Sequence, residues 1–219
     1  MAAQIIYGVQ PVHEAERGRR RVRRVWRAPE TPAGELERLC GSPDHQGIVA
    51  EVDPYPYGDV EGMLRKPDAL IVALDQVQDP RNLGAVCRSA ESAGAGGVVI
   101  PERRAAMVTP VVCKASAGAV EHLEVAHVRN LADWLASAKG AGFWIWGADA
   151  DGSQPPWGVD LTGPTVLVLG GEGKGLRPRV AASCDGLIAL PRLGEVESLN
   201  VSAAATALLF ESVRQRVRS

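Results

Sequence analysis

The chain has 219 residues, a formal net charge of −2, and charged residues make up 23% of its composition. This length is enough for one sizeable core, or one core with a small appendage, and the composition is that of an ordinary globular protein. No apolar run approaches the roughly eighteen residues of a membrane helix, and the N-terminus lacks a signal-peptide core, so we expect a cytoplasmic protein with no membrane partner.

The cysteines and histidines show no spacing typical of a metal site. Cys40, Cys87, Cys113 and Cys184 are scattered, with no paired spacing and no nearby histidine. Neither a zinc site nor a disulfide framework is indicated. We therefore expect reduced cysteines and no metal.

An arginine-rich run lies near the N-terminus. Seven of the eleven residues from 17 to 27 are arginines, and Trp26 lies among them. A guanidinium offers a planar pair of donors to phosphate oxygens, so such a run is typical of an RNA-binding surface. The alternative is a solvated face of a strand or helix. The residues expected to bind RNA are Arg19, Arg20, Arg21, Arg23 and Arg24.

A stretch rich in proline and tyrosine divides the chain. Residues 45–52 alternate as a strand does, and residues 53–59 are rich in types that stop regular structure. We predict a small N-terminal α+β substrate-binding domain at 1–58, a linker at 59–67 and a larger domain at 68–219. The first domain is small enough to need its neighbour's surface for stability.

From Leu70 onward, apolar runs typical of buried strands alternate with helical patterns. Strands are predicted at 70–74, 98–100, 122–126, 143–147, 165–169 and 187–190, and helices at 83–93, 111–117, 131–138 and from Val201 onward. This alternation predicts an α/β fold with a mostly parallel sheet.

Three polar clusters follow strands of this sheet, where α/β proteins bind ligands. They are residues 75–84 with Arg88, the glycine-rich loop at 169–176, and residues 197–202. Glycines let the loop turn sharply and approach a ligand without an intervening Cβ. The alanine-rich helix that follows suits a crowded position, although core packing explains its small residues equally well.

Taken alone, the glycine-rich loop is weak evidence. It lacks the GK[ST] ending of a P-loop, and no acidic residue follows at the distance that a dinucleotide-binding fold requires. A nicotinamide-dependent oxidoreductase is therefore only a third hypothesis.

Together, the clusters resemble the three motifs of the SpoU (TrmH-like) RNA 2′-O-ribose methyltransferases of the SPOUT superfamily. The motifs are Asn82-x-Gly84-x-x-x-Arg88, Gly170-Gly171-Glu172-Gly173-x-Gly175-Leu176, and Leu190-Pro191 leading into Glu197-Ser198-Leu199-Asn200-Val201-Ser202. The resemblance covers residues 68–217. Residues 6–9 and 45–50 are similar to the opening and closing of that family's small domain, here shortened, particularly in its 23S ribosomal RNA guanosine methyltransferase branch.

This resemblance implies several properties that the residue patterns do not show. The C-terminal segment would form a deep trefoil knot, an exception to the rule against knotted chains. S-adenosylmethionine would be the cofactor, held largely by main-chain groups of the three loops. The family works as a homodimer in which the partner completes each active site.

Carried over to the matching positions, the resemblance assigns two groups of residues. The cofactor contacts would be Gly170, Gly171, Ile188, Leu190 and Leu199. The residues around the reacting ribose would be Asn82, Arg88, Glu172, Ser198 and Asn200. In that family, the arginine at the position matching Arg88 is usually assigned the role of deprotonating the ribose hydroxyl. Because arginine is essentially never neutral in water, we expect it instead to hold the adjacent phosphate and stabilise the developing alkoxide.

The motifs alone do not decide the roles of Asn82 and Asn200 or the function of the protein. Taken singly, Asn82 and Asn200 are as compatible with plain helix caps as with catalysis. The leading hypothesis is a ribose methyltransferase acting on 23S ribosomal RNA, in ribosomal RNA processing or antibiotic resistance, and transfer RNA is the alternative substrate. A knotted ribosome-assembly factor without catalysis is the alternative of another class.

Overall fold

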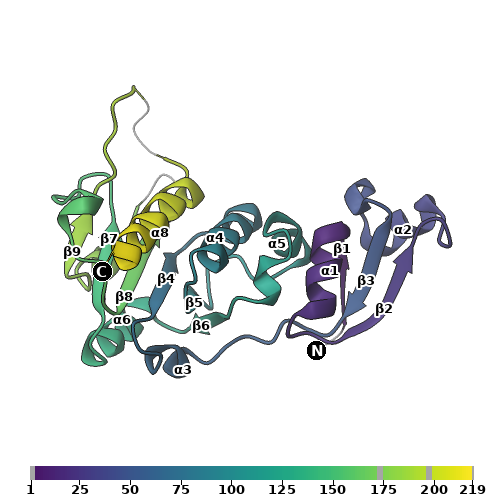
Figure 1. Cartoon of the computed structure of the whole chain (residues 1–219), viewed down its shortest axis with the longest axis horizontal. Helices are drawn as coiled ribbons and strands as arrows, with labels where there is room; N and C mark the ends of the chain where they lie inside the picture. The colour runs from purple at the N-terminus through teal and green to yellow at the C-terminus, as the bar shows by residue number, and fades with distance from the viewer. Residues whose placement is uncertain (1–2, 172–174, 196–198, 219) are drawn as a thin grey trace.

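The computed structural model describes residues 3–171, 175–195 and 199–218, and Figure 1 shows two units side by side, joined by an extended segment. The smaller unit is built on an antiparallel sheet of order β1-β3-β2. Its elements are β1 (Gln4–Tyr7), α1 (Val9–Arg17), β2 (Val22–Arg27), α2 (Ala33–Cys40), the 3-10 turn η1 (Pro43–His45) and β3 (Ile48–Val52).

The larger unit is a six-stranded sheet of order β6-β5-β4-β8-β7-β9 in which every pairing is parallel, so the predicted α/β fold is confirmed. The strands are β4 (Leu70–Asp75), β5 (Gly97–Pro101), β6 (Val125–Val128), β7 (Trp144–Ala148), β8 (Thr165–Gly170) and β9 (Gly186–Ile188). The helical segments are α3 (Val60–Leu64), α4 (Pro80–Ser92), α5 (Pro110–Ala115), η2 (Ala119–Glu121), α6 (Leu131–Gly140), η3 (Pro156–Gly158), α7 (Pro178–Ala181) and α8 (Val201–Arg218). Among the described residues, no helix combines the length and apolarity needed to cross a bilayer.

The strand β4 is buried along its whole length because its side chains alternate between two cores. Leu70, Val72 and Leu74 pack on the side of α4 and α8. Ile71 and Ala73 pack on the side of α6 and α7. Burial on both faces explains why the strands of this sheet are nearly continuous apolar runs. Since all six strands run the same way, their carboxyl ends lie along one edge of the sheet.

Two strands begin three residues later than the sequence pattern indicates. The strand predicted at 122–126 is β6, which begins at Val125 after a 3-10 turn. The strand predicted at 45–52 is β3, which begins at Ile48 because Gln46 and Gly47 have φ values of 55° and 77°, incompatible with extended backbone. The trefoil knot and the domain boundaries stay predictions.

All four cysteines are free thiols. Burial raises the pKa of both Cys87 and Cys113 to about 12. Both thiols therefore stay protonated near neutral pH and behave as small core residues.

The two units share one continuous core. Ile6 and Val12 of the small unit belong to the same buried cluster as Val112 and Val120 of the large unit. Tyr55, in the connecting segment, donates a hydrogen bond from its hydroxyl to the carbonyl oxygen of Leu123 at 2.8 Å. The small unit is therefore packed against α5 and η2.

Arg20 lies inside this contact, so its assignment to the RNA-binding surface is corrected. Its Nε donates to Oε2 of Glu121 at 2.8 Å, and its Nη2 donates to Oε1 of Glu121 and, at 3.2 Å, to Sγ of Cys113. Neither charged side chain is exposed. Burial opposes the charge, but the hydrogen bonds to Glu121 and neighbouring charges raise the pKa of Arg20 above its ordinary value. Arg20 therefore stabilises the contact between the two units and has no surface to offer to RNA.

Replacing Arg20 with methionine is expected to lower the free energy of unfolding by about 3–5 kcal/mol, because the Glu121 carboxylate would stay buried without its partner. Urea unfolding followed by tryptophan fluorescence measures this change. Arg23→Met is the matched control: Arg23 forms an exposed ion pair with Asp53, at 2.5 Å, and its loss is expected to cost less than about 1 kcal/mol. Equal costs for the two variants would show that the buried pair does not anchor the units.

Candidate active site

The carboxyl edge of the sheet brings the predicted cofactor residues close to one another. Ala148, at the end of β7, is paired in register with Leu169 of β8 on one side and with Ile188 of β9 on the other. Adjacent strands lie about 4.8 Å apart, so Leu169 and Ile188 are about 10 Å apart. Gly170 directly follows Leu169, which places the second motif beside the end of β9.

The glycine-rich loop is closed on itself and pressed against a neighbouring loop. Gly171 and Gly175 form an antiparallel bridge. A Cβ at Gly170 would overlap the carbonyl group of Gly175, and a Cβ at Gly171 would lie 2.6 Å from the carbonyl oxygen of Gln76. Both obstacles are backbone, which cannot rotate away. The close approach of the two loops therefore requires glycine at 170 and 171.

A hydrogen bond between asparagine side chains joins the first and third motifs. Nδ2 of Asn200 donates to Oδ1 of Asn82 at 3.0 Å, across 118 positions of sequence. The backbone N–H of Ser202 donates to Oδ1 of Asn200 at 2.8 Å, so Asn200 also caps α8. Asn82 is not a cap, because Asp79 caps α4 by accepting from the N–H of Arg81. Asn82 is only 7% exposed, and its side chain is directed to the other motif.

Arg88 lies further along α4 and is exposed to solvent. Within the ranges that the structure describes, no acidic side chain forms an ion pair with it. The next residue, Ser89, shares a hydrogen bond of 2.7 Å with Thr206 of α8, which fixes α4 against α8 at this level. Arg88 is thus an exposed cation on a firmly positioned helix, suited to bind an anion.

The remaining predicted site residues differ in exposure. Ile188 is 1% exposed, Leu190 is half-buried against the main core, and Leu199 is 53% exposed just before α8. Leu190 and Leu199 therefore keep exposed apolar surface, whereas Ile188 is part of the core. Glu172 and Ser198, which the resemblance places at the reacting ribose, lie outside the described residues.

The predicted RNA-binding arginines of the small unit separate into two groups. Arg19, like Arg20, is held at the contact between the units, since its Nη2 donates to the hydroxyl of Tyr55 and to the carbonyl oxygen of Leu123. Arg21, Arg23 and Arg24 are exposed on or beside β2, an edge strand of the small sheet. The guanidinium of Arg24 lies 4.9 Å from the ring centroid of Trp26. The second group keeps the character of a phosphate-binding surface.

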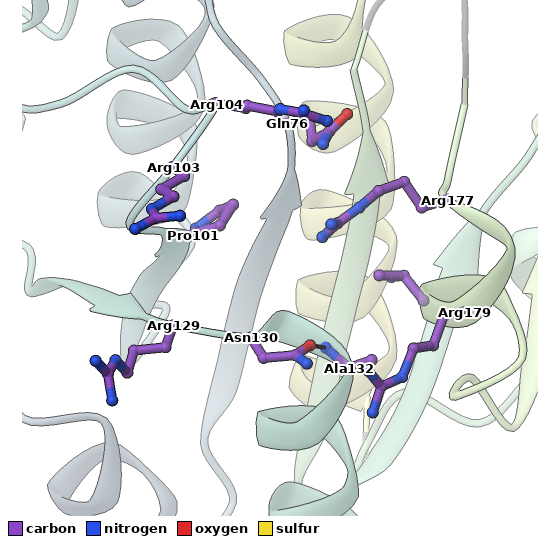
Figure 2. A pocket seen from close by; sticks show the side chains of 10 residues that line it. Gln76, Pro101, Arg103, Arg104, Arg129, Asn130, Ala132, Arg177 and Arg179 are labelled. Carbon is purple, nitrogen blue, oxygen red and sulfur yellow. Dashed lines mark hydrogen bonds between the residues drawn. The ribbon is translucent and has the colours of Figure 1, made fainter.

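The sequence pattern did not single out a pocket of about 370 Å³ at the same edge of the sheet, shown in Figure 2. It is lined by Gln76, Pro101, Arg103, Arg104, Arg129, Asn130, Ala132, Arg177, Arg179 and Val180. Five of these ten residues are arginines. Among them, only Arg103 and Arg104 lie just after a predicted strand, at 98–100, and this position was the available signal, since residues after parallel strands converge at one edge.

Proteins similar in sequence are named as RNA methyltransferases. An "uncharacterized tRNA/rRNA methyltransferase" of Mycobacterium sp. (strain KMS) is 45% identical over 85% of this chain, which spans 61% of that relative's length. The "putative TrmH family tRNA/rRNA methyltransferase YacO" of Bacillus subtilis (strain 168) is 35% identical, with 96% of this chain and 95% of the relative covered.

Solved structures agree with these relatives. The SpoU methyltransferase AviRb of Streptomyces viridochromogenes, crystallised with the cofactor AdoMet, has a TM-score of 0.82 and 29% identity, with 98% of this chain and 91% of AviRb covered. A putative RNA methyltransferase of the TrmH family from Porphyromonas gingivalis has a TM-score of 0.81 and the same identity, with coverage of 99% and 90%.

The family model described as "SpoU rRNA Methylase family" matches residues 69–210. This range contains the whole six-stranded sheet and all three motifs. The chain therefore belongs to the SpoU rRNA methylase family.

Proposed function

We propose that this chain transfers a methyl group from S-adenosylmethionine to a ribose 2′-hydroxyl of structured RNA, and that a guanosine of 23S ribosomal RNA is the first candidate. The observation that carries the proposal is the hydrogen bond between Asn82 and Asn200, because it assembles the first and third family motifs beside the glycine-rich loop. The AdoMet complex of AviRb supports the choice of methyl donor.

The residues at the end of β8 and β9 fit this donor. Gly170 and Gly171 present backbone without side chains, and Leu190 and Leu199 offer apolar surface to an adenine ring. S-adenosylmethionine supplies an electrophilic methyl group on a sulfonium when bound. The chain's own task is then to hold a ribose hydroxyl in line with that methyl group and to favour loss of its proton.

Arg88 is the group that we assign to the RNA side of the reaction. Its guanidinium stays charged, so it holds the phosphate next to the reacting ribose and stabilises negative charge that develops on the hydroxyl oxygen. Asn82 and Asn200 keep the start of α4 and α8 in place. Glu172 and Ser198 complete the group by their positions in the motifs.

Recognition of RNA and assembly of a homodimer are parts of the same proposal. The exposed arginines beside β2 offer the small unit a phosphate-binding surface. Ala203, Ala207, Phe210 and Val217 are exposed on α8 at spacings of four, three and seven, and Phe210 and Val217 are 47% and 80% exposed. Arg214, which pairs with Glu211, is exposed on the same face between Phe210 and Val217. This mainly apolar stripe supports a second copy packing on α8. We expect the dimer to act in the cytoplasm, where ribosomal and transfer RNA are found.

Mass-spectrometric mapping of ribose methylation in ribosomal and transfer RNA, from cells with and without the gene, tests the substrate. A mark lost from 23S ribosomal RNA supports the first candidate, and a mark lost from transfer RNA replaces it with the alternative. Methylation that is unchanged in both RNA classes favours the non-catalytic assembly factor.

Gly170→Ala is expected to abolish detectable binding of S-adenosylmethionine, because the new Cβ would push the loop away from Gly175. Isothermal titration calorimetry measures the affinity, and circular dichroism checks that the chain stays folded. Gly140→Ala, at the end of α6, is the matched control, since its Cβ would meet no atom within 4 Å. If Gly170→Ala binds S-adenosylmethionine as tightly as the unchanged chain does, the assignment of this loop to the donor site is wrong.

Arg88→Ala is expected to lower the rate of methyl transfer on the order of 100-fold, as loss of a single charge-stabilising donor does. Donor affinity is expected to change little, because Arg88 acts on the RNA. Single-turnover transfer and calorimetry separate the two quantities. Arg81→Ala on the same helix, also exposed, is the control. An equal loss of rate and donor affinity would contradict this division of roles.

A further inference from the structure

We propose that Arg103, Arg104 and Arg129, here called the arginine pocket, bind a backbone phosphate of the substrate RNA next to the methyl-transfer site. The proposal rests on the proposed function for the identity of the RNA as substrate. It assigns a second phosphate contact, separate from that of Arg88.

The arginine pocket is built from the ends of two adjacent parallel strands. Arg103 and Arg104 follow β5, and Arg129 follows β6, which is paired with β5 up to Pro101 and Val128. Figure 2 shows Arg103 and Arg129 on one side of the pocket and Arg177 and Arg179 on the opposite side, with Asn130 between them. In this view the guanidinium groups of Arg103 and Arg129 extend outward, away from Arg177 and Arg179. The arginines therefore line two opposite sides of one pocket.

The charge of the pocket is only partly balanced. Nη2 of Arg177 lies 2.7 Å from Oδ1 of the buried Asp75, and Nη2 of Arg179 lies 2.5 Å from Oδ1 of Asp133. In the described parts of the chain, no carboxylate forms an ion pair with the three members of the arginine pocket. Three like charges at one edge repel one another, and a bound anion relieves this repulsion.

The start of α6 adds to the attraction for an anion. Asn130 caps this helix of ten residues by accepting a hydrogen bond from the N–H of Ala132 at 3.1 Å. Asn130 and Ala132 both line the pocket, so the positive end of the helix dipole faces it.

The pocket shares a wall with the methyl-transfer site. Gln76 lines the pocket, and its carbonyl oxygen lies against Gly171 of the glycine-rich loop. Arg177 follows the same loop and is tied by its backbone N–H to Asp75 at 2.9 Å. The pocket lies on the side of α6 and α7, whereas Asn82 and Asn200 lie on the side of α4 and α8. An RNA strand that crosses the loop thus contacts both sides of one edge.

The size of the pocket favours a phosphate within RNA over a free ion. A volume of about 370 Å³ exceeds by roughly tenfold the 30 Å³ that one water molecule occupies in the liquid. Arg103, Arg104 and Arg129 are also exposed to solvent, so a polymer can reach them from outside. A phosphodiester with its flanking sugars fits such an open, wide, cationic site.

The test compares the double variant Arg103→Gln/Arg129→Gln with a matched control, Arg38→Gln/Arg65→Gln, which removes the same charge from exposed positions in α2 and after α3. Fluorescence anisotropy of a labelled oligouridylate, measured over a series of salt concentrations, gives the affinity and its salt dependence. The pocket variant is expected to bind about tenfold more weakly, and its salt slope to fall by about 1.4, or 0.7 for each lost contact with single-stranded RNA. The control variant is expected to match the unchanged chain.

Unchanged affinity and unchanged salt slope in the pocket variant would overturn the proposal. So would binding of inorganic phosphate that depends on these arginines while oligouridylate binding does not, since the site would then serve a free anion. Calorimetric titration with S-adenosylmethionine on the same proteins reports the proposed function separately. Suppose that neither the unchanged chain nor any variant binds the donor, but the pocket variant still loses RNA affinity. The RNA-binding role of the arginine pocket would then be supported, and the proposed methyl transfer would be contradicted.

Discussion

The hydrogen bond between Asn82 and Asn200 fixes the geometry on which the rest of the site depends. Asn82 is almost fully buried, and a buried amide left without a partner costs about 1–3 kcal/mol. The start of α8 is therefore held to the start of α4, although 118 positions separate the two residues. Asn82 follows β4, whereas Asn200 follows β9, which is separated from β4 by β8 and β7 in the sheet. The bond therefore brings the start of α8 back across the sheet to the start of α4. A local interaction between two amides thus joins distant parts of the chain at the point where chemistry is expected.

Most strands of the large sheet could be predicted from the sequence because they are buried on both faces. Strands buried on both faces are nearly continuous apolar runs, so β4, β5, β7 and β8 were placed to within one or two residues. The start of β3 was less visible, because it is set by positive φ at Gln46 and Gly47, which apolar periodicity does not report. The helices α1 and α2 were not predicted, since the arginine run and its flanks dominate the composition of that region. Each motif can be recognised in the sequence, but the hydrogen bond between Asn82 and Asn200 depends on the tertiary structure and cannot be predicted from either motif.

Arginine shows most clearly where sequence reasoning ends. Arg20 and Arg24 lie in the same run, yet Arg20 is buried against Glu121, a partner 101 positions away, while Arg24 lies over Trp26 at the surface. Nothing in the local sequence distinguishes them, because the deciding partner comes from the other unit. The converse holds for Arg103 and Arg129, which are separated in sequence and become neighbours only because β5 pairs with β6.

The glycine-rich loop gives the sheet edge two usable sides. Gly171 packs directly against the backbone at Gln76, so the described start of the loop lies close to the segment that follows β4. One side carries the asparagine pair and Arg88, and the other carries the arginine pocket. A flexible polymer such as RNA loses conformational entropy when it is ordered, so under the proposed function contacts on both sides of a reacting ribose would hold that ribose more closely than one contact does. Side chains at 170 and 171 would meet the backbone of Gly175 and Gln76, so glycine at both positions keeps the described ends of this loop and the segment after β4 in close contact.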